Sequence, residues 1–430
     1  MYISLRSAPA ASAGRPRGIR TVSSTVVTLG IVSLLTDISS ESVAAILPLY
    51  VTGVLGLSTV AFGVLDGLYQ GVSALVRIAG GYTSDRIGRP KWVAFSGYAT
   101  AAVARAGLLF ASGFAALSIV LTADRIGKGV RTAPRDALIA AASAPEDRGH
   151  AFGVHRMLDN IGAALGPLIA FVILWAIPDG FDVVFAASLA FSVLGVVILA
   201  LLVPNLRSRR AAAGGARGDD DAAHAAHRAD APPRRRRDWR ALTRGPLRRV
   251  LAAAGILGLL TIGDGFIYLV LQARSDFAAQ WFPLLYVGTN VAFLAFAIPL
   301  GRLSDRIGRA RVFVFGHLAL LAAYLVATLA VDDLVATALC LLFLGAFYAA
   351  TDGVLAALAA ELTPADTRAT GIAAAQTVVA LSRFASASVF GVMWWALGQD
   401  VALVVVAALL AVAVPVSALI LRPLLAVRST

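Results

Sequence analysis

Apolar segments of about twenty residues recur along the whole chain, and no other feature of the sequence constrains the fold as much. About 20 apolar residues are needed for a helix to cross the roughly 30 Å hydrocarbon core of a bilayer. A spanning backbone must also satisfy its polar groups internally, which a helix does. We therefore predict an all-α membrane protein with twelve transmembrane helices. The predicted spans are 24–50, 60–82, 92–112, 115–138, 152–176, 183–203, 250–271, 280–301, 312–330, 334–360, 368–396 and 400–421.

The composition supports a bilayer as the solvent of this chain. Apolar residues make up 59% of the 430 residues and charged residues only 14%, whereas about 25% are charged in an ordinary soluble domain. This balance excludes a disordered protein and a soluble nucleotide-dependent enzyme. Cys340 is the sole cysteine, which excludes a disulfide framework. The histidines are scattered and no phosphate-binding Gly-x-x-x-x-Gly-Lys-[Ser/Thr] motif occurs, so we expect no enzyme, cofactor or resident metal.

The arginines outside the spans lie almost entirely in one alternate set of loops. The opposite set of loops carries Arg274 alone. Because arginine-rich loops stay on the cytoplasmic side, both termini are predicted to be cytoplasmic in a bacterial-type plasma (inner) membrane. The net charge of +12 is then explained by the arginines of the cytoplasmic loops, and no nucleic-acid partner is expected. The predicted parts are an N-terminal tail (1–23), a six-helix half (24–203), a basic linker (204–249), a second six-helix half (250–421) and a C-terminal stub (422–430).

An internal repeat relates the two predicted halves. The loop at 81–91 recurs at 301–311, an offset of 220 residues, and both copies have the pattern Gly-x-x-x-Asp-Arg-x-Gly-Arg. Two parallel repeats related by an axis along the membrane normal are a recognised transporter architecture. The motif residues are Gly81, Asp85, Arg86, Gly88 and Arg89 in the first half and Gly301, Asp305, Arg306, Gly308 and Arg309 in the second.

With these two loops the sequence resembles the major facilitator superfamily, and the resemblance spans about residues 24–421. It implies a secondary transporter that works by alternating access, with the substrate held between the halves. It also implies that contacts of the loop motif lock one conformation and break in the other. In the fifth span, Gly162, Gly166 and Pro167 resemble the antiporter motif of exporters, with Ala170 where a glycine is usual.

Carboxylates inside the spans are candidates for transport, because a charge in hydrocarbon is costly. Asp37 lies at the midpoint of the first span, and Glu41 lies one helical turn later on the same face. Two carboxyl groups this close in a low dielectric cannot both be ionised cheaply, so we predict that the pair carries a coupling proton. Asp264 and Asp352 lie in the seventh and tenth spans, the counterparts of the first and fourth.

The fourth span carries cations instead. Arg125 and Lys128 lie deep in this span, within a segment that resembles the arginine motif of the family. Each needs a partner, which a carboxylate on the first span or an anionic substrate would supply. The sequence therefore favours a monomeric, proton-coupled exporter of a small anionic or amphiphilic organic compound, with the substrate, protons and the lipid bilayer as its partners.

Two alternatives stay open from the sequence. Asp37, Glu41 and Asp264 together would offer oxygen ligands to a hard cation, which favours export of a divalent metal ion. The same charges are also compatible with proton-coupled uptake of an organic anion or a siderophore.

Overall fold

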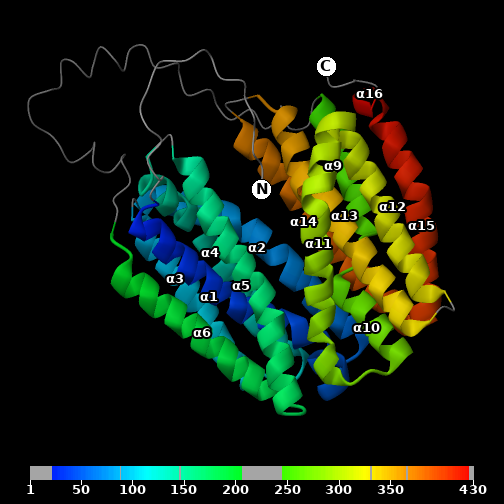
Figure 1. Cartoon of the computed structure of the whole chain (residues 1–430), viewed down its shortest axis with the longest axis horizontal. Coiled ribbons are helices and arrows are strands. Elements are labelled where there is room, and N and C mark those ends of the chain that lie inside the picture. Colours follow the sequence, from blue (N-terminus) through cyan, green and yellow to red (C-terminus); the bar gives the residue numbers. More distant parts are fainter. Residues whose placement is uncertain are drawn as a thin grey trace, which may run out of the picture.

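The computed structural model describes residues 22–87, 89–144, 147–205, 245–329, 332–364 and 367–425, except for the side chains of 78–87 and 369. No strand occurs within these ranges. Figure 1 shows two helical bundles, one formed by α1–α6 and the other by α9–α15, which are inclined to each other. Most of the predicted tail and linker, and the end of the predicted C-terminal stub, lie outside the described residues.

The first half begins at a capped helix. The Ser23 hydroxyl accepts a hydrogen bond from the Val26 N–H, which satisfies one of the free donors of the first turn of α1. The helices of this half are α1 (Ser24–Leu49, extended by the π-helical turn η1, Tyr50–Val54), α2 (Thr59–Ile87), α3 (Pro90–Leu108), α4 (Phe114–Ala141), α5 (Arg148–Ala176) and α6 (Phe181–Leu202).

The second half repeats this arrangement with one interruption. The seventh predicted span, 250–271, is two helices separated by Leu260–Gly263, so the prediction of one continuous helix is wrong there. The segments of this half are α9 (Pro246–Leu259), α10 (Asp264–Ser275), the short η3 (Ala279–Trp281), α11 (Pro283–Ile307), α12 (Arg309–Thr328), α13 (Asp333–Glu361), α14 (Arg368–Leu397), α15 (Gln399–Ile420) and the short α16 (Arg422–Leu425).

Each of the twelve predicted spans coincides with a helical segment of the described chain, with ends that differ by a few residues. Ten of these segments are long and apolar enough to cross a membrane. The other two, α3 and α4, are more polar. Their charged side chains are hidden inside the first bundle: Arg105, Asp124, Arg125 and Arg131 are all at most 3% exposed. These helices therefore span the bundle with their charges turned away from lipid.

Glycines allow close contact between the two halves along α2 and α14. A side chain at Gly63 would meet the backbone of Ala387 and Gly391, and one at Gly67 would meet Phe384. Small residues spaced four apart are typical of tightly packed membrane helices. The contact between α2 and α14 is thus a seam that joins the halves.

The two ends of the interface between the halves differ. We call the end at which α1 begins and α6 ends the linker end. At the opposite end, the Phe171 and Trp281 rings of the two halves lie 5.4 Å apart. Nearer the linker end, Arg156 on α5 and Asp352 on α13 interact electrostatically across the interface, yet their side chains are 72% and 58% exposed. The halves are therefore in contact at the opposite end. Nearer the linker end, where the bundles diverge in Figure 1, Arg156 and Asp352 are exposed, although Arg77 of α2 still donates to Gln376 of α14 at 3.3 Å.

Candidate functional site

Close packing of α1 against α5 builds the first part of the site. A side chain at Gly162 would strike the backbone of Leu34, and one at Gly166 would strike the backbone of Ile38 and Ser42. The absence of a side chain at both glycines lets the two helices approach closely. The residues that resemble an antiporter motif therefore form the contact that sets the position of α5 relative to Asp37 on α1.

This contact brings a carboxyl group of α5 to Asp37. The Asp37 and Asp159 side chains face each other and interact across this contact. Arg131 lies 4.0 Å from Asp37, and Arg135 lies 3.7 Å from Asp159. The carboxyl partner of Asp37 in this conformation is thus Asp159, whereas the sequence pointed to Glu41.

Arg125 is occupied by its own neighbour in the sequence. Its guanidinium donates to Asp124 through both Nε, at 2.8 Å, and Nη2. It also lies over the Tyr69 ring, 3.7 Å from the ring centre, a favourable position for a cation. Arg105 approaches the same carboxylate from α3 at 3.0 Å. Asp124 therefore joins α3 and α4 as a buried ion-paired group, and the direct partner of Arg125 is this carboxylate, although Arg125 also interacts electrostatically with Glu41 of α1.

Lys128 is one of the cations of α4 that face the first helix. It interacts electrostatically with both Asp37 and Glu41. Within the described ranges it makes no ion pair at 4.0 Å or less. Its ammonium group therefore lies near two carboxyl groups without a close ion pair to either of them.

A second cluster of charges lies in the other half. The Tyr348 hydroxyl donates to Asp264 at 2.7 Å, and Arg383 lies 3.8 Å from Asp352. Asp264 lies in the first turn of α10, where the positive end of the helix dipole favours a carboxylate. The two predicted carboxylates of this half thus meet around Arg383, which the sequence did not single out.

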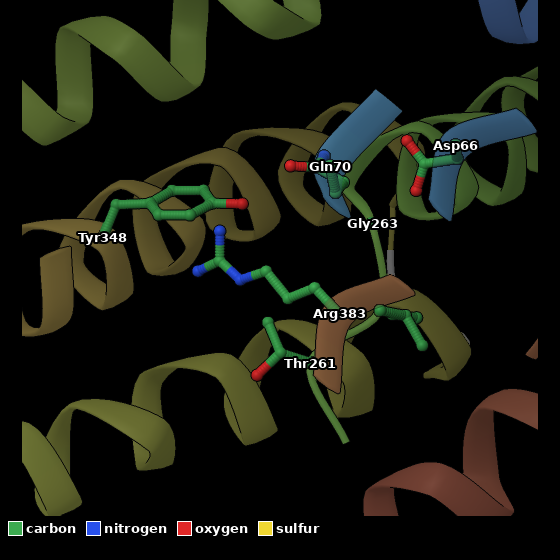
Figure 2. Close-up of a pocket in the computed structure, with 7 residues that line it drawn as sticks. Asp66, Gln70, Thr261, Gly263, Tyr348 and Arg383 are labelled. Carbon is green, nitrogen blue, oxygen red and sulfur yellow. The ribbon is translucent and has the colours of Figure 1, made fainter. Parts of the chain in front are cut away.

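The break between α9 and α10 lies beside this cluster. The Tyr324 hydroxyl fixes the break by accepting from the Ile262 N–H and donating to the Leu260 carbonyl, both at 3.0 Å. Interrupted membrane helices are typical of transporter binding sites. In Figure 2, Asp66 of α2 lies beside Gly263, and Arg383 extends beneath the Tyr348 ring. A small pocket of about 10 Å³ is lined by Asp66, Gln70, Thr261, Ile262, Gly263, Tyr348 and Arg383.

The loop motif is described in the second half only. Arg309 lies 3.4 Å from Asp305 on α11 and 3.2 Å from Glu361 on α13. Gly308 has a φ of 98°, which glycine adopts without strain and which makes the turn into α12. Gly301 begins the motif in α11, and Arg306 lies in the last turn of that helix. In the first half Arg89 is exposed, whereas Gly88 and the side-chain positions of Gly81, Asp85 and Arg86 lie outside what the structure describes.

A metal site is not assembled from the predicted ligands in this conformation. Asp264 is bonded to Tyr348 in the second cluster, whereas Asp37 and Glu41 lie beside Lys128. Over the described ranges, no three His, Cys, Asp or Glu side chains gather in a way that would hold a metal ion.

The sequence profile of the Major Facilitator Superfamily matches residues 29–387 and 266–428. The chain belongs to the major facilitator superfamily. An uncharacterized transporter of the same type from Methanocaldococcus jannaschii is 27% identical over 386 residues, which are 87% of this chain and 89% of the relative. An uncharacterized protein of Mycobacterium tuberculosis is 32% identical over 144 residues, 33% of this chain and 35% of the relative. The protein is thus a membrane transporter and not an enzyme.

Solved structures of this superfamily share the fold. The nucleoside transporter NupG matches with a TM-score of 0.73 at 14% identity, covering 93% of this chain and 99% of that one. A bacterial homologue of the human lysosomal transporter Spinster, in an inward-facing unoccupied conformation, matches with a TM-score of 0.71 at 14% identity, covering 94% and 98%. At these identities the likeness concerns the fold alone.

Two charged residues of the site, Asp159 and Arg383, were not selected from the sequence, and a helical pattern would have found one of them. Asp159 precedes Gly162 by three residues and Gly166 by seven, so it shares their face of α5 and must point toward α1. No comparable pattern marks Arg383, because its partners lie on other helices.

Proposed function

We propose that this transporter couples the movement of protons to the export of a small anionic or amphiphilic organic compound by alternating access. The observation that carries the proposal is the position of Lys128, which lies near Asp37 and Glu41 without an ion pair in the described part of the chain. Such an ammonium group can bind the negative charge of a ligand, and the neighbouring carboxyl groups can bind protons.

The same charges supply a coupling scheme. While the site is empty, carboxylates of α1 balance the charge of Lys128. An anionic ligand that takes over the ammonium group removes one of the positive charges that act on these carboxylates, which favours their protonation even though Arg131 stays 4.0 Å from Asp37.

The direction of transport is proposed from two observations. The halves are in contact at the end opposite the linker, and nearer the linker end the Arg156 and Asp352 side chains at their interface are exposed to solvent. If the linker end is cytoplasmic, as the arginines of the loops indicate, the site is open to the cytoplasm and positioned to load a compound for export. Gly162, Gly166 and Pro167 of α5, which resemble the motif of exporters, support the same direction. We place the transporter in a bacterial-type inner membrane, working as a monomer.

A thermal-shift screen of the purified protein against organic anions, amphiphilic drugs and divalent metal ions tests the ligand class. A ligand present at 100 times its Kd stabilises its site by about 2.7 kcal/mol. We expect organic anions to raise the melting temperature of the wild type but not of Lys128→Gln. Lys91→Gln is the matched control, because Lys91 donates to the Ala200 carbonyl, outside the site. Stabilisation by divalent metal ions alone, or by anions equally in Lys128→Gln, would contradict the proposal.

A further inference from the structure

The second cluster of charges contains more carboxylates than cations. Three aspartates interact with the single guanidinium group of Arg383, namely Asp66, Asp264 and Asp352. Asp352 lies 3.8 Å from Arg383, and Asp264 accepts a hydrogen bond from the Tyr348 hydroxyl at 2.7 Å. These two carboxylates thus have close partners. An anion-binding charge in the first half leaves the excess of negative charge in this cluster unexplained.

Asp66 is the carboxylate of this cluster that lacks a close cationic partner. Within the described ranges it makes no ion pair at 4.0 Å or less, and its Oδ2 atom is buried and accepts no hydrogen bond. In Figure 2 the guanidinium group of Arg383 extends toward the Tyr348 ring, 5.5 Å from the ring centre, and away from Asp66. A buried carboxylate oxygen without a donor is costly, so Asp66 is the group of this cluster that gains most from a donor on a ligand.

The space beside Asp66 fits a small cationic group. The pocket that Asp66 lines together with Thr261 and Gly263 has a volume of about 10 Å³, which is about the room that one water-sized group needs. A methyl group on Gly263 would strike the Oδ2 atom of Asp66, so the glycine at the helix break keeps this space open. The Thr261 hydroxyl donates to the Leu257 carbonyl at 2.9 Å, which leaves its oxygen able to accept. A primary ammonium group, with three donors, matches this size and these acceptors, whereas a trimethylammonium group is too large.

The helix α2 connects this pocket to the first cluster of charges. Asp66 and Gln70 line the pocket, and Tyr69 follows Asp66 by three residues, so the two side chains are neighbours on the helix. The Tyr69 ring lies under Arg125 of α4, 3.7 Å from the ring centre, and Lys128 follows Arg125 by three residues. A compact ligand with its carboxylate at Lys128 therefore has Asp66 within a few side chains of its other end.

We propose that the transported compound is a zwitterion, whose primary ammonium group binds Asp66 beside the helix break while its carboxylate binds Lys128. The inference rests on the proposed anion site at Lys128 and adds the second charge of the ligand. Asp66 belongs to the first half, whereas Thr261 and Gly263 belong to the second. The ammonium group therefore contacts both halves at their interface, and the two charges orient the ligand between α4 and the helix break.

Isothermal titration calorimetry of the purified protein with four probes tests the two charges. ε-Aminocaproate carries both charges, caproate has only the carboxylate, hexylamine has only the ammonium group, and the ε-trimethylammonium derivative of caproate has an enlarged cationic end. We expect ε-aminocaproate to bind roughly tenfold or more tightly than each of the other three, because a hydrogen bond to a charged group contributes about that factor.

Two variants locate the ammonium group. Asp66→Asn should bind ε-aminocaproate no more tightly than caproate, while its affinity for caproate stays within a few-fold of the wild type. Asp333→Asn is the matched control, since Asp333 pairs with Arg274 at 2.7 Å and does not line the pocket, and it should bind ε-aminocaproate as the wild type does.

Three results would overturn the inference. The first is equal affinity of the wild type for ε-aminocaproate and caproate, or no binding of ε-aminocaproate. The second is equal affinity for the trimethylammonium derivative. Both comparisons use the wild type and do not depend on the folding of a variant. The third is competition between sodium ions and ε-aminocaproate that disappears in Asp66→Asn, which would assign the pocket to an inorganic cation.

The proposed function fails separately. Equal affinity for caproate and ε-aminocaproate, with loss of both in Lys128→Gln, would keep the anion site and remove the ammonium contact. Binding of ε-aminocaproate through both charges, with a flux in proteoliposomes that ignores a pH gradient, would keep the zwitterion site and contradict the proton coupling.

Discussion

Replacing Asp124 with asparagine should destabilise the first helical half severely, although the two side chains have almost the same volume. The Asp124 carboxylate lies 3.0 Å from Arg105 and also binds Arg125. All three side chains are at most 3% exposed. Asparagine leaves two buried guanidinium groups without a counter-charge, and breaking one buried ion pair costs about 3–5 kcal/mol.

The chain contains a matched control on the same helix. Asp136 also pairs with the arginine beside it in the sequence, at 3.1 Å from Arg135, but its side chain is 45% exposed. An exposed ion pair contributes roughly 0–1 kcal/mol. Asp124→Asn and Asp136→Asn thus make the same chemical change in two similar pairs that differ mainly in burial.

The melting temperatures of both variants in detergent can be followed by heating and size-exclusion chromatography. About 1 kcal/mol shifts the melting temperature of a 150–250-residue unit by roughly 2–4 °C. Asp124→Asn should therefore lower it by roughly 6–20 °C, and Asp136→Asn by less than about 4 °C. A second change, Arg105→Gln, should add little to Asp124→Asn, because it removes one of the unpaired charges. Equal shifts for the two asparagine variants would refute the reasoning from burial.

Three further predictions concern the packing and the loop motif. Gly162→Val should reduce the yield of folded protein, measured by size-exclusion chromatography, because the valine side chain would strike the backbone of Leu34. Gly149→Val is the control, since position 149 has open space around it, and equal yields would contradict the close α1–α5 contact. Gly263→Ala should lower the melting temperature because its methyl group meets Asp66, and Asp66→Ala in the same chain should restore it; failure of that rescue would place the strain elsewhere. Arg309→Gln, which removes the contacts to Asp305 and Glu361, should slow transport in proteoliposomes while ligand affinity stays within a few-fold; a large loss of affinity with unchanged turnover would show that the motif binds ligand.

Most of the spans were predictable because hydrophobic length determines them, although α3 and α4 are too polar to meet that criterion. The break at Leu260–Gly263 was not, because this segment is apolar and lies within a run long enough for one helix. What fixes the break is the Tyr324 hydroxyl, which bonds two backbone groups from a helix some sixty positions later in the chain. Such a contact between distant helices leaves no local pattern in the sequence.

The identity of the charged residues was predictable, but their pairing was not. Asp37, Arg125, Lys128 and Asp264 stand out in the sequence because each is an ion inside an apolar span. Which partner each one meets depends on helix rotation and on contacts between helices. Arg125 turns to Asp124 on its own helix, and only the glycine contacts between α1 and α5 explain why Asp37 meets a carboxyl group of α5.

The central claim is that carboxyl groups beside Lys128 couple transport to a proton gradient. The most direct test measures the flux of a ligand identified by thermal shift into proteoliposomes, with and without an imposed pH gradient, for the wild type and for Asp37→Asn combined with Glu41→Gln. The account predicts that the gradient drives accumulation in the wild type, and that the double variant binds the ligand and exchanges it downhill without responding to the gradient. A double variant that accumulates the ligand as the wild type does would contradict it.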